Sequence, residues 1–111
     1  MQILRGDVWW IDFSSSKPTS GEIKKMRPAI IVSNDASNKA MNRVQVIPLT
    51  SQTDKCYPCE AYVKVDGKKN KAMADQIMTV SKTRLTKRMG KIAIPDLTDV
   101  ERALKVQLDL Y

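Results

Sequence analysis

The sequence predicts a mainly β protein, a small antiparallel barrel followed by one C-terminal α-helix. Short apolar or alternating segments recur along the chain, and turn-forming residues separate them about every eight to twelve residues. These segments leave no room for βαβ crossovers, which argues against a parallel sheet. The hydrophobic spacing becomes helical near the end of the chain. All 111 residues are therefore predicted to form a single domain, residues 1–111.

Six segments have the composition of β-strands. Residues 7–13 (DVWWIDF) combine aromatic and β-branched side chains, and residues 28–34 (PAIIVSN) form an apolar run that suits a central strand. Trp9 and Trp10 are adjacent on the first strand, so one is expected in the core and the other on a surface or interface. Further strands are predicted over residues 43–50, 59–65, 72–80 and 90–94.

The connections between the strands carry recognisable turn and cap residues. Residues 14–22 are rich in Ser, Pro and Gly and predict a flexible loop. Asn34 or Asp35 is placed to cap a short helical turn after the second strand. Asp66-Gly67 is a strong turn signal at the end of an alternating segment.

The C-terminal helix is predicted because its apolar residues fall at spacings of three or four. Pro95 precedes the helical pattern, and Thr98 and Glu101 have the spacing of a capping box. The expected apolar face comprises Leu97, Val100, Leu104, Leu108 and Tyr111.

The charge of the chain indicates an anionic partner. Nineteen basic residues oppose twelve acidic ones, for a net charge of +7 and a pI of about 9.6. Such a surface attracts phosphate backbones or an acidic protein. Eight of the basic residues lie between positions 68 and 91, where Asp75 is the one acid. With aromatic residues at 5%, a platform that stacks many bases is not expected.

Residue types that are missing exclude several mechanisms. The chain has no histidine, which excludes a Ser-His-Asp triad, a paired-histidine ribonuclease mechanism and zinc sites that need imidazole. Cys56 and Cys59 form a lone C-x-x-C, and we interpret them as ordinary thiols, with no metal or cofactor. No apolar run approaches the roughly 18 residues of a membrane span, and the N-terminus is no secretion signal, so we expect a cytoplasmic protein.

Carboxylates, arginine and hydroxyl groups are the remaining candidates for acid–base chemistry. Arg27 stands where a basic loop enters the apolar strand, five positions after Glu22. Thr50 ends a strand, and Asp75 lies in the middle of another predicted strand. If the barrel brings them together, a carboxylate could accept a proton from a 2′-hydroxyl while Arg27 and Thr50 bind the phosphate. The alternative is structural, with Arg27 paired to a neighbour, Thr50 a strand end and Asp75 bonded to backbone.

The order of motifs resembles the MazF/PemK family of toxin endoribonucleases. The matching segments are "RGDVWWIDF", "GEIKKMRPAIIVSND" and "VQVIPLTS", followed by "ADQI", a basic segment over residues 81–90 and a C-terminal helix. The family pattern is an R-G-D/E start, a loop that ends in R-P before an apolar strand, and a strand that ends in P-x-T. The resemblance spans nearly the whole chain, and "RP" before the apolar strand is its most specific part.

This resemblance implies an SH3-like barrel of the CcdB/PemK type that forms a homodimer. It implies an antitoxin with an acidic, disordered C-terminal tail, and operator DNA bound only through that antitoxin. The implied activity is metal-independent, ribosome-independent cleavage of single-stranded mRNA at specific sequences, leaving a 2′,3′-cyclic phosphate or 3′-phosphate and a 5′-hydroxyl. Arg27 and Thr50 match the catalytic arginine and threonine of the family, Glu22 matches its loop glutamate, and Asp75 matches a carboxylate that some members use as a base.

The chain departs from the family pattern at three positions. Ile23 and Lys25 stand where the loop of the family usually has Gln and Gly, so RNA access or sequence preference is expected to differ. Met73 stands where some members carry an arginine that serves as general acid. Because an arginine is a poor general base, Arg27 is assigned to transition-state stabilisation and is a candidate general acid, and the general base is left open.

A basic surface is expected to guide the phosphates of the RNA and to dock the antitoxin tail. Two other functions are kept open, a toxin of the same fold that binds DNA gyrase without chemistry, and a basic module that holds nucleic acid without cleaving it. The candidate RNA-binding residues are Lys24, Lys25, Gln76, Lys82, Arg84, Lys87 and Arg88.

Overall fold

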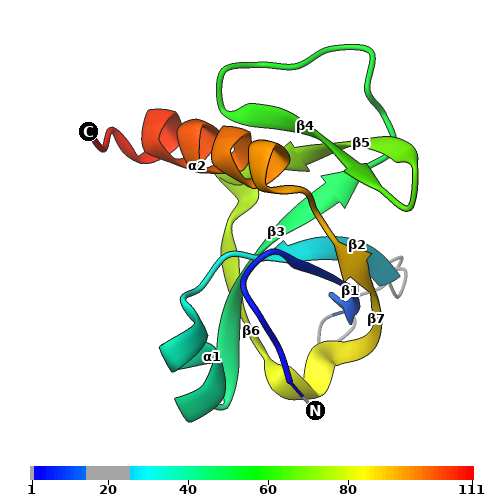
Figure 1. Cartoon of the computed structure of the whole chain (residues 1–111), viewed down its shortest axis with the longest axis vertical. Coiled ribbons are helices and arrows are strands. Elements are labelled where there is room, and N and C mark those ends of the chain that lie inside the picture. The colour runs from blue at the N-terminus through cyan, green and yellow to red at the C-terminus, as the bar shows by residue number, and fades with distance from the viewer. Residues whose placement is uncertain (1, 15–25) are drawn as a thin grey trace, which may run out of the picture.

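The computed structural model describes residues 2–14 and 26–111, which form an antiparallel sheet, two α-helices and two 3₁₀ turns (Figure 1). The predicted loop over residues 14–22 falls almost wholly outside the described residues. The strands are β1 (Asp7–Asp12), β2 (Met26–Ile31), β3 (Arg43–Thr50), β4 (Glu60–Val65), β5 (Lys68–Met73), β6 (Met78–Ser81) and β7 (Leu85–Lys91). The helices are α1 (Asp35–Ala40) and α2 (Ile94–Leu108), and the 3₁₀ turns are η1 (Ala74–Gln76) and η2 (Lys82–Arg84).

The strands pair in the order β4-β5-β3-β2-β1-β7, with β6 added to the other end of β3. All of these strand pairs are antiparallel. The first half of β3 pairs with β6, while its last residues, Leu49 and Thr50, pair with β5. This change of partner curls the sheet into a half-barrel, which confirms the predicted mainly β, antiparallel barrel with a C-terminal helix.

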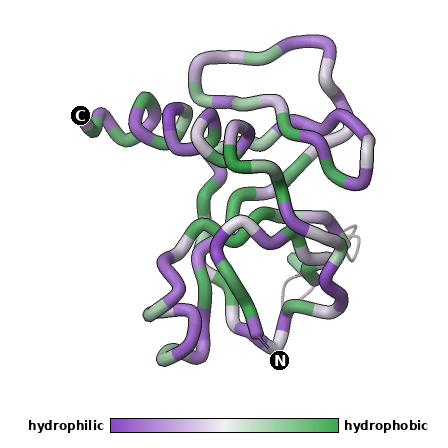
Figure 2. The backbone as a smooth tube through the Cα atoms, viewed as in Figure 1, coloured by the Kyte–Doolittle hydropathy of each residue, from purple (hydrophilic) through white to green (hydrophobic). Residues whose placement is uncertain are grey.

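Both faces of the central strands are buried. On β1, Val8 belongs to one core cluster, whereas Trp9 and Ile11 belong to a second. The first cluster lies under α2 and contains Val100 and Ala103 of that helix. Figure 2 shows hydrophobic residues gathered along the central strands and hydrophilic ones on α1 and on the outer turn of β4 and β5. Trp9 is buried and Trp10 is half-buried, so the prediction of opposite faces is confirmed.

The predicted strand over residues 72–80 is wrong, because this part of the chain forms β5, η1 and β6 in succession. Asp66 and Gly67 both have positive φ, 52° and 77°, as a two-residue hairpin turn requires. The ladder therefore resumes at Lys68, earlier than the apolar pattern indicates. The turn η1 then carries the chain from the side of β5 to the other end of β3.

The predicted strand over residues 90–94 is also displaced, since β7 is Leu85–Lys91. Most side chains of β7 are polar and exposed, so hydrophobic alternation does not identify this strand. Its pairing with β1 determines where it begins and ends. Ile92 returns to the core, and α2 begins at Ile94.

The short helix α1 has the predicted cap, because the side chain of Asn34 accepts a hydrogen bond from the backbone N–H of Ser37 at 2.8 Å. The capping box of α2 is wrong. Ala93 is the N-cap and makes no side-chain hydrogen bond, while the hydroxyl of Thr98 donates to the carbonyl of Ile94 at 3.0 Å. Pro95 lies in the first turn of the helix, where its missing N–H would have no partner in any case.

The apolar face of α2 is buried over only part of its length. Val100 is buried, and Leu97 and Leu104 pack against the core. Leu108 is 51% exposed, and Tyr111 is fully exposed. Figure 1 shows the reason, since the C-terminal end of α2 extends beyond the sheet. The helical period was predicted correctly, but how far the face is covered depends on tertiary structure.

Candidate active site

Two adjoining cavities lie where β2 begins and β3 ends. The first, called here the Trp10 cavity, has a volume of about 580 Å³. The second, the Phe13 cavity, has a volume of about 480 Å³. The Trp10 cavity is lined by Trp10, Met26, Arg27, Pro28, Leu49, Thr50, Ser51, Gln52 and Asn70. The Phe13 cavity is lined by Phe13, Arg27, Pro48, Thr50, Gln52, Lys71, Met73, Gln76 and Met78.

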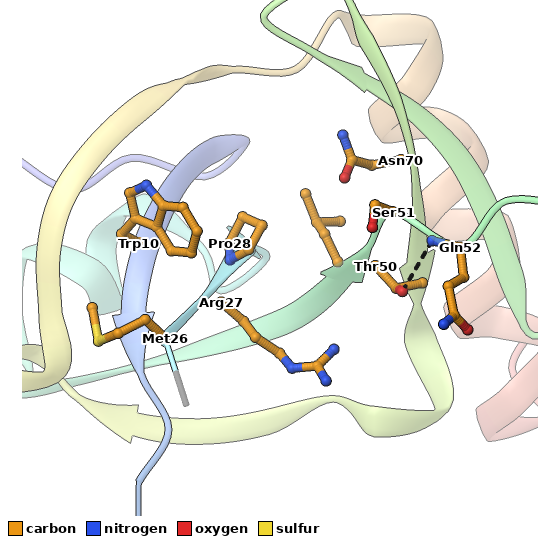
Figure 3. Close-up of a pocket in the computed structure, with 9 residues that line it drawn as sticks. Trp10, Met26, Arg27, Pro28, Thr50, Ser51, Gln52 and Asn70 are labelled. Carbon is orange, nitrogen blue, oxygen red and sulfur yellow. Dashed lines mark hydrogen bonds between the residues drawn. The ribbon is translucent and has the colours of Figure 1, made fainter. Parts of the chain in front are cut away.

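Arg27 is placed in both cavities by strand pairing. On β2, Ala29 pairs with Pro48 of β3, and continuing this antiparallel register sets Arg27 opposite Thr50. Residues opposite each other across a ladder project from the same face of a sheet, so both side chains emerge together. Figure 3 shows Arg27 pointing away from Trp10 and Pro28. The predicted association of the strand-entry arginine with the strand-end threonine is thus present in the structure.

The guanidinium of Arg27 has no hydrogen bond and no ion pair to any described residue. The side chain is half-buried, so its positive charge is partly shielded from bulk water. A guanidinium presents five N–H donors in a planar fork that matches the oxygens of a phosphate. Within the described part of the chain, the site therefore offers an unpaired cation to an incoming anion.

The hydroxyl of Thr50 is oriented by the turn that follows β3. Its oxygen accepts a hydrogen bond from the backbone N–H of Gln52 at 3.2 Å, which is the dashed line in Figure 3. A hydroxyl that accepts from a backbone N–H still has its own hydrogen to donate. Thr50 is therefore arranged as a donor beside Arg27.

A second cation in the Phe13 cavity, Lys71, was missed in the sequence. Lys71 pairs with Thr50 on the β3–β5 ladder, and its Nζ atom lies 3.2 Å from Oε2 of Glu60. The same Nζ donates to the carbonyl of Lys55 at 2.9 Å, while Oε1 of Glu60 accepts from the backbone N–H of Tyr57 at 2.9 Å. The signal that could have found this pair is the hairpin turn, because its register brings Glu60 and Lys71 onto diagonal positions of neighbouring strands.

The loop over residues 51–59, which contributes Ser51 and Gln52 to the cavities, is anchored from several sides. The hydroxyl of Tyr62 donates to the carbonyl of Thr53 at 2.7 Å. On α2, Arg102 donates to the carbonyls of Pro58 and Glu60 at 3.0 and 2.9 Å. These contacts, together with Lys71, fix the wall of the site opposite β2.

The turn η1 contains both Asp75 and Gln76, but only Gln76 lines one of the two cavities. The expectation that Asp75 lies in the middle of a strand is wrong, because the 3₁₀ turn includes it and its side chain is exposed. Asp75 lines neither cavity, whereas Gln76 lines the Phe13 cavity and donates to Sδ of Met73 at 3.4 Å. The turn brings the amide to the site and leaves the carboxylate at its margin.

Two arginines of the predicted basic surface have internal partners among the described residues. Arg84 donates to the carbonyls of Ser14 and Asp12, and Arg88 pairs with the buried carboxylate of Asp7 at 3.2 Å. Arg88 thus links β7 to β1, and Arg84 links η2 to the C-terminal end of β1 and to Ser14 beyond it.

Lys87 is exposed and stands opposite Trp10 on the β1–β7 ladder, so it projects on the side of the Trp10 cavity. Lys82 lines a separate cavity near α1. Glu22, Ile23, Lys24 and Lys25 lie outside the described residues.

The described residues form neither a metal-binding cluster nor a membrane-spanning helix. Within residues 2–14 and 26–111, no three Cys, Asp or Glu side chains gather in a way that could hold a metal ion. Of the two helices described, neither is long and apolar enough to cross a membrane.

Comparisons with known proteins agree on one family. The model of the PemK-like, MazF-like toxins of type II toxin–antitoxin systems matches residues 4–108. The endoribonuclease MazF9 of Mycobacterium tuberculosis is 32% identical over 119 aligned positions, which cover 96% of this chain and 97% of MazF9.

Solved structures give the same result. An endoribonuclease from a mycobacterial species superposes with a TM-score of 0.81 at 26% identity, covering 99% of this chain and 94% of the other. An endoribonuclease in complex with its cognate antitoxin, also mycobacterial, has a TM-score of 0.80 at 28% identity, covering 98% and 97%. The chain therefore belongs to the PemK-like, MazF-like toxin family of type II toxin–antitoxin systems.

Proposed function

We propose that this protein is an endoribonuclease that cleaves single-stranded RNA, and that it is the toxin of a toxin–antitoxin pair. The observation that carries the proposal is the half-buried Arg27, which has no partner among the described residues and shares a cavity with the hydroxyl of Thr50. Family membership and the endoribonuclease name of the 32% identical relative support the same activity.

The proposed reaction is transesterification within the RNA. The 2′-oxygen attacks the neighbouring phosphorus, a 2′-O–P bond forms, and the P–O5′ bond breaks. The products are a 2′,3′-cyclic phosphate and a 5′-hydroxyl, and water can later open the cyclic ester to a 3′-phosphate. The proton leaves the 2′-hydroxyl for a general base, and the departing 5′-oxygen receives a proton from a general acid, for which Arg27 is the candidate.

Arg27 stabilises the charge that develops on the non-bridging oxygens of the phosphate. Thr50 donates its hydroxyl hydrogen to one of the same oxygens. Arg27 therefore supplies the positive charge that a metal ion provides in other nucleases, and the proposed reaction needs no metal. The general base is not assigned. Asp75 lies at the margin of the site, and Glu22 lies outside the described residues.

RNA is proposed to reach the site along its basic rim. The candidate contacts are Gln76, which lines the Phe13 cavity together with Arg27, and Lys87, which stands opposite Trp10 on the β1–β7 ladder. The net charge of +7 supports a phosphate-binding surface.

The proposed protein partners are a second copy of the chain and an antitoxin with an acidic, disordered tail. The similarity to an endoribonuclease solved in complex with its cognate antitoxin supports an antitoxin. We propose that operator DNA is bound only through this antitoxin. The acidic tail would compete with RNA, since both present anions to Arg27.

The test uses a single-stranded RNA with mapped cleavage sites, incubated with the purified protein in excess EDTA. Cleavage with 5′-hydroxyl and cyclic phosphate ends is expected. A single 2′-deoxy substitution on the 5′ side of the cleaved bond is expected to abolish cleavage at that bond only. A requirement for added metal, or 5′-phosphate ends, would contradict the mechanism.

A further inference from the structure

The loop over residues 51–59 contains the two cysteines of the chain, Cys56 and Cys59. Figure 1 shows this loop, in green, between the end of β3 and the start of β4. Both thiols are free, and Cys56 is exposed whereas Cys59 is partly buried. As a sequence motif the pair is a weak signal, but the structure places it in a loop that lines the candidate site.

The side chain of Cys56 is directed toward a turn that contains Cys59. The backbone N–H of Glu60 donates to the carbonyl of Tyr57 at 2.8 Å, so Pro58 and Cys59 form the centre of a tight turn. Sγ of Cys56 lies 3.9 Å from the same carbonyl oxygen of Tyr57. Two residues separate the cysteines in the chain, which is the spacing of exchangeable dithiols in disulfide oxidoreductases.

A cation on α2, Arg102, lies close to both cysteines. It donates to the carbonyls of the residues before and after Cys59, at 3.0 and 2.9 Å. A hydrogen bond to Asp99 raises the pKa of Arg102, and the charge of a nearby Cys56 thiolate acts in the same direction. The thiolate is the form that attacks a disulfide, and a neighbouring cation attracts it. Exposure and this cation together make Cys56 the attacking thiol and Cys59 the thiol that completes the bond.

The backbone on both sides of Cys56 is held by the ion pair of Lys71 and Glu60. The carbonyl of Lys55 accepts from Nζ of Lys71 at 2.9 Å. The N–H of Tyr57 donates to Oε1 of Glu60 at 2.9 Å. Lys71 also lines the Phe13 cavity, so the position of Cys56 is coupled to a wall of the candidate site.

Cys59 is coupled to the same cavity from another side. Its carbonyl accepts from the backbone N–H of Ala74 at 3.2 Å, and Ala74 begins the turn η1. The same turn carries Gln76 into the Phe13 cavity. A change in the geometry of the two cysteines is therefore transmitted to the site through β5 and through η1.

We propose that Cys56 and Cys59 form a reversible disulfide that slows RNA cleavage, made by exchange with a low-molecular-weight disulfide such as oxidised glutathione. The inference rests on the proposed ribonuclease function and names a regulation of its site. In this account the reduced protein, with both thiols free, is the active form.

The exchange has two steps. The thiolate of Cys56 attacks one sulfur of the reagent, a mixed disulfide forms, and half of the reagent leaves as a thiolate. The thiolate of Cys59 then attacks Sγ of Cys56 and expels the other half. Each departing thiolate takes up a proton, which balances the proton that a cysteine has lost. The two cysteines are oxidised by two electrons, and the reagent is reduced to two thiols.

The disulfide is expected to disturb the site because it constrains a segment that is already held from both sides. A disulfide sets its two Cβ atoms about 3.8 Å apart. Lys71 and Glu60 hold the backbone around Cys56, so closing the ring pulls on these contacts. Displacement of Lys71 then alters the wall of the cavity that it shares with Arg27.

The test equilibrates the purified protein in glutathione buffers with increasing ratios of oxidised to reduced glutathione. Mass spectrometry after alkylation of free thiols is expected to show that both thiols disappear together, with the loss of two hydrogens and no added glutathione. Because the chain has two cysteines, the loss reports on this pair alone. The rate of RNA cleavage should fall about tenfold in parallel, through displacement of the site, and should return on reduction.

Cys56→Ser and Cys59→Ser are the matched variants. Each is expected to cleave RNA at about the wild-type rate under reducing conditions, because neither cysteine lines the two cavities. Each should keep that rate in oxidising buffer, since an internal disulfide can no longer form. A fall in the rate of both variants as large as that of the wild type would contradict the switch.

Amide hydrogen exchange reads out the switch without RNA. The N–H groups of Tyr57 and Ala74 are hydrogen-bonded to Glu60 and Cys59, and both are expected to exchange about tenfold faster in the oxidised protein. Equal exchange in the two forms would overturn the proposed coupling between the cysteines and the site.

The remaining outcomes separate this inference from the proposed function. Thiols that stay free, a lasting mixed disulfide with glutathione, or a doubled mass from a bond between two copies would each overturn the internal disulfide. A disulfide that forms without changing the cleavage rate would show that it does not regulate the site. If the reduced protein cleaves no RNA, the proposed function fails, and the thiol and exchange measurements still decide whether the disulfide forms and moves the loop.

Discussion

Of the two cations among the described residues that line the Phe13 cavity, only Lys71 has a carboxylate partner within the described part of the chain. Lys71 is buried, and both its side chain and that of its partner Glu60 are about 10% exposed. Its Nζ atom also donates to the carbonyl of Lys55. Arg27 lines the same cavity and is half-buried, but it has no hydrogen bond or ion pair to a described residue.

The difference in pairing between Lys71 and Arg27 corresponds to two roles, stabilising the fold and binding a substrate. A buried charge must be paired if the fold is to be stable, and Lys71 with Glu60 joins β5 to β4 and holds the loop beside the site. A charge that binds a substrate must stay unpaired until the substrate arrives, and preorganised cations of this kind stabilise transition states. Lys71 therefore contributes to the stability of the site, and we propose that Arg27 contributes to its chemistry.

The largest effect is expected for Arg27→Ala. Loss of the phosphate-binding guanidinium should lower kcat/KM for RNA cleavage by about 10³-fold, by analogy with the loss of one oxyanion donor. The melting temperature should stay close to that of the wild type, because the guanidinium makes no hydrogen bond or ion pair to a described residue. Arg43→Ala, at an exposed position on β3, is the matched control and should retain activity.

Growth arrest by Arg27→Ala in cells addresses the alternative function. The variant is expected to be folded and non-toxic. Toxicity at the wild-type level would instead favour a toxin that acts by binding, such as one that binds DNA gyrase.

Lys71→Met is expected to reduce the stability of the protein, unlike Arg27→Ala. It leaves Glu60 buried without a partner and should lower the free energy of unfolding by about 3 kcal/mol. Denaturant unfolding measures this loss. The double variant Lys71→Met with Glu60→Gln should recover much of it, since the uncompensated charge is gone. Equal stability of Lys71→Met and the wild type would contradict a structural role for the pair.

A smaller effect on activity is expected for Thr50→Val, which keeps the shape and removes the hydroxyl. Loss of one hydrogen bond to a charged phosphate corresponds to a decrease in kcat of roughly 10- to 100-fold. Thr79→Val is the control, because Thr79 is exposed on β6 and its hydroxyl contacts only Gln45 among the described residues. Should both variants cleave RNA equally fast, Thr50 has no part in the reaction.

Lys87→Ala is expected to have the smallest effect. Removing one phosphate contact should reduce the salt dependence of RNA affinity, with the slope of log K against log salt falling by about 0.7. The measurement is RNA binding across a range of salt concentrations. Lys82→Ala is the comparison, because Lys82 lines a separate cavity and its slope should change less.

Much of this arrangement follows from the sequence, and the missing part has a common physical cause. The apolar runs predicted β1, β2 and β3, and the helical period predicted α2. The strand over residues 90–94 was predicted too late in the chain, because most side chains of β7 are polar. Its position is determined by its pairing with β1. The hydrophobic pattern of a single segment does not show which strand it pairs with.

The site shows the same division. A charged residue at a strand entry and a hydroxyl at a strand end made Arg27 and Thr50 candidates, and the resemblance to the MazF/PemK family selected them. Lys71 looked like part of a surface charge run, and only the register of β4 against β5 shows that Glu60 neutralises it. Asp75 was assigned to a strand because the apolar residues around it gave no indication of the turn η1.

The most direct test of the central claim asks whether Arg27 interacts with the charge of the phosphate at the cleaved position. It compares the Kd values of two uncleavable RNAs, both with 2′-deoxyribose at that position, one with a normal phosphate there and one with an uncharged methylphosphonate. The wild-type protein should bind the neutral analogue at least tenfold more weakly, while Arg27→Ala should bind both about equally. The same loss of affinity in both proteins would show that Arg27 does not hold this phosphate.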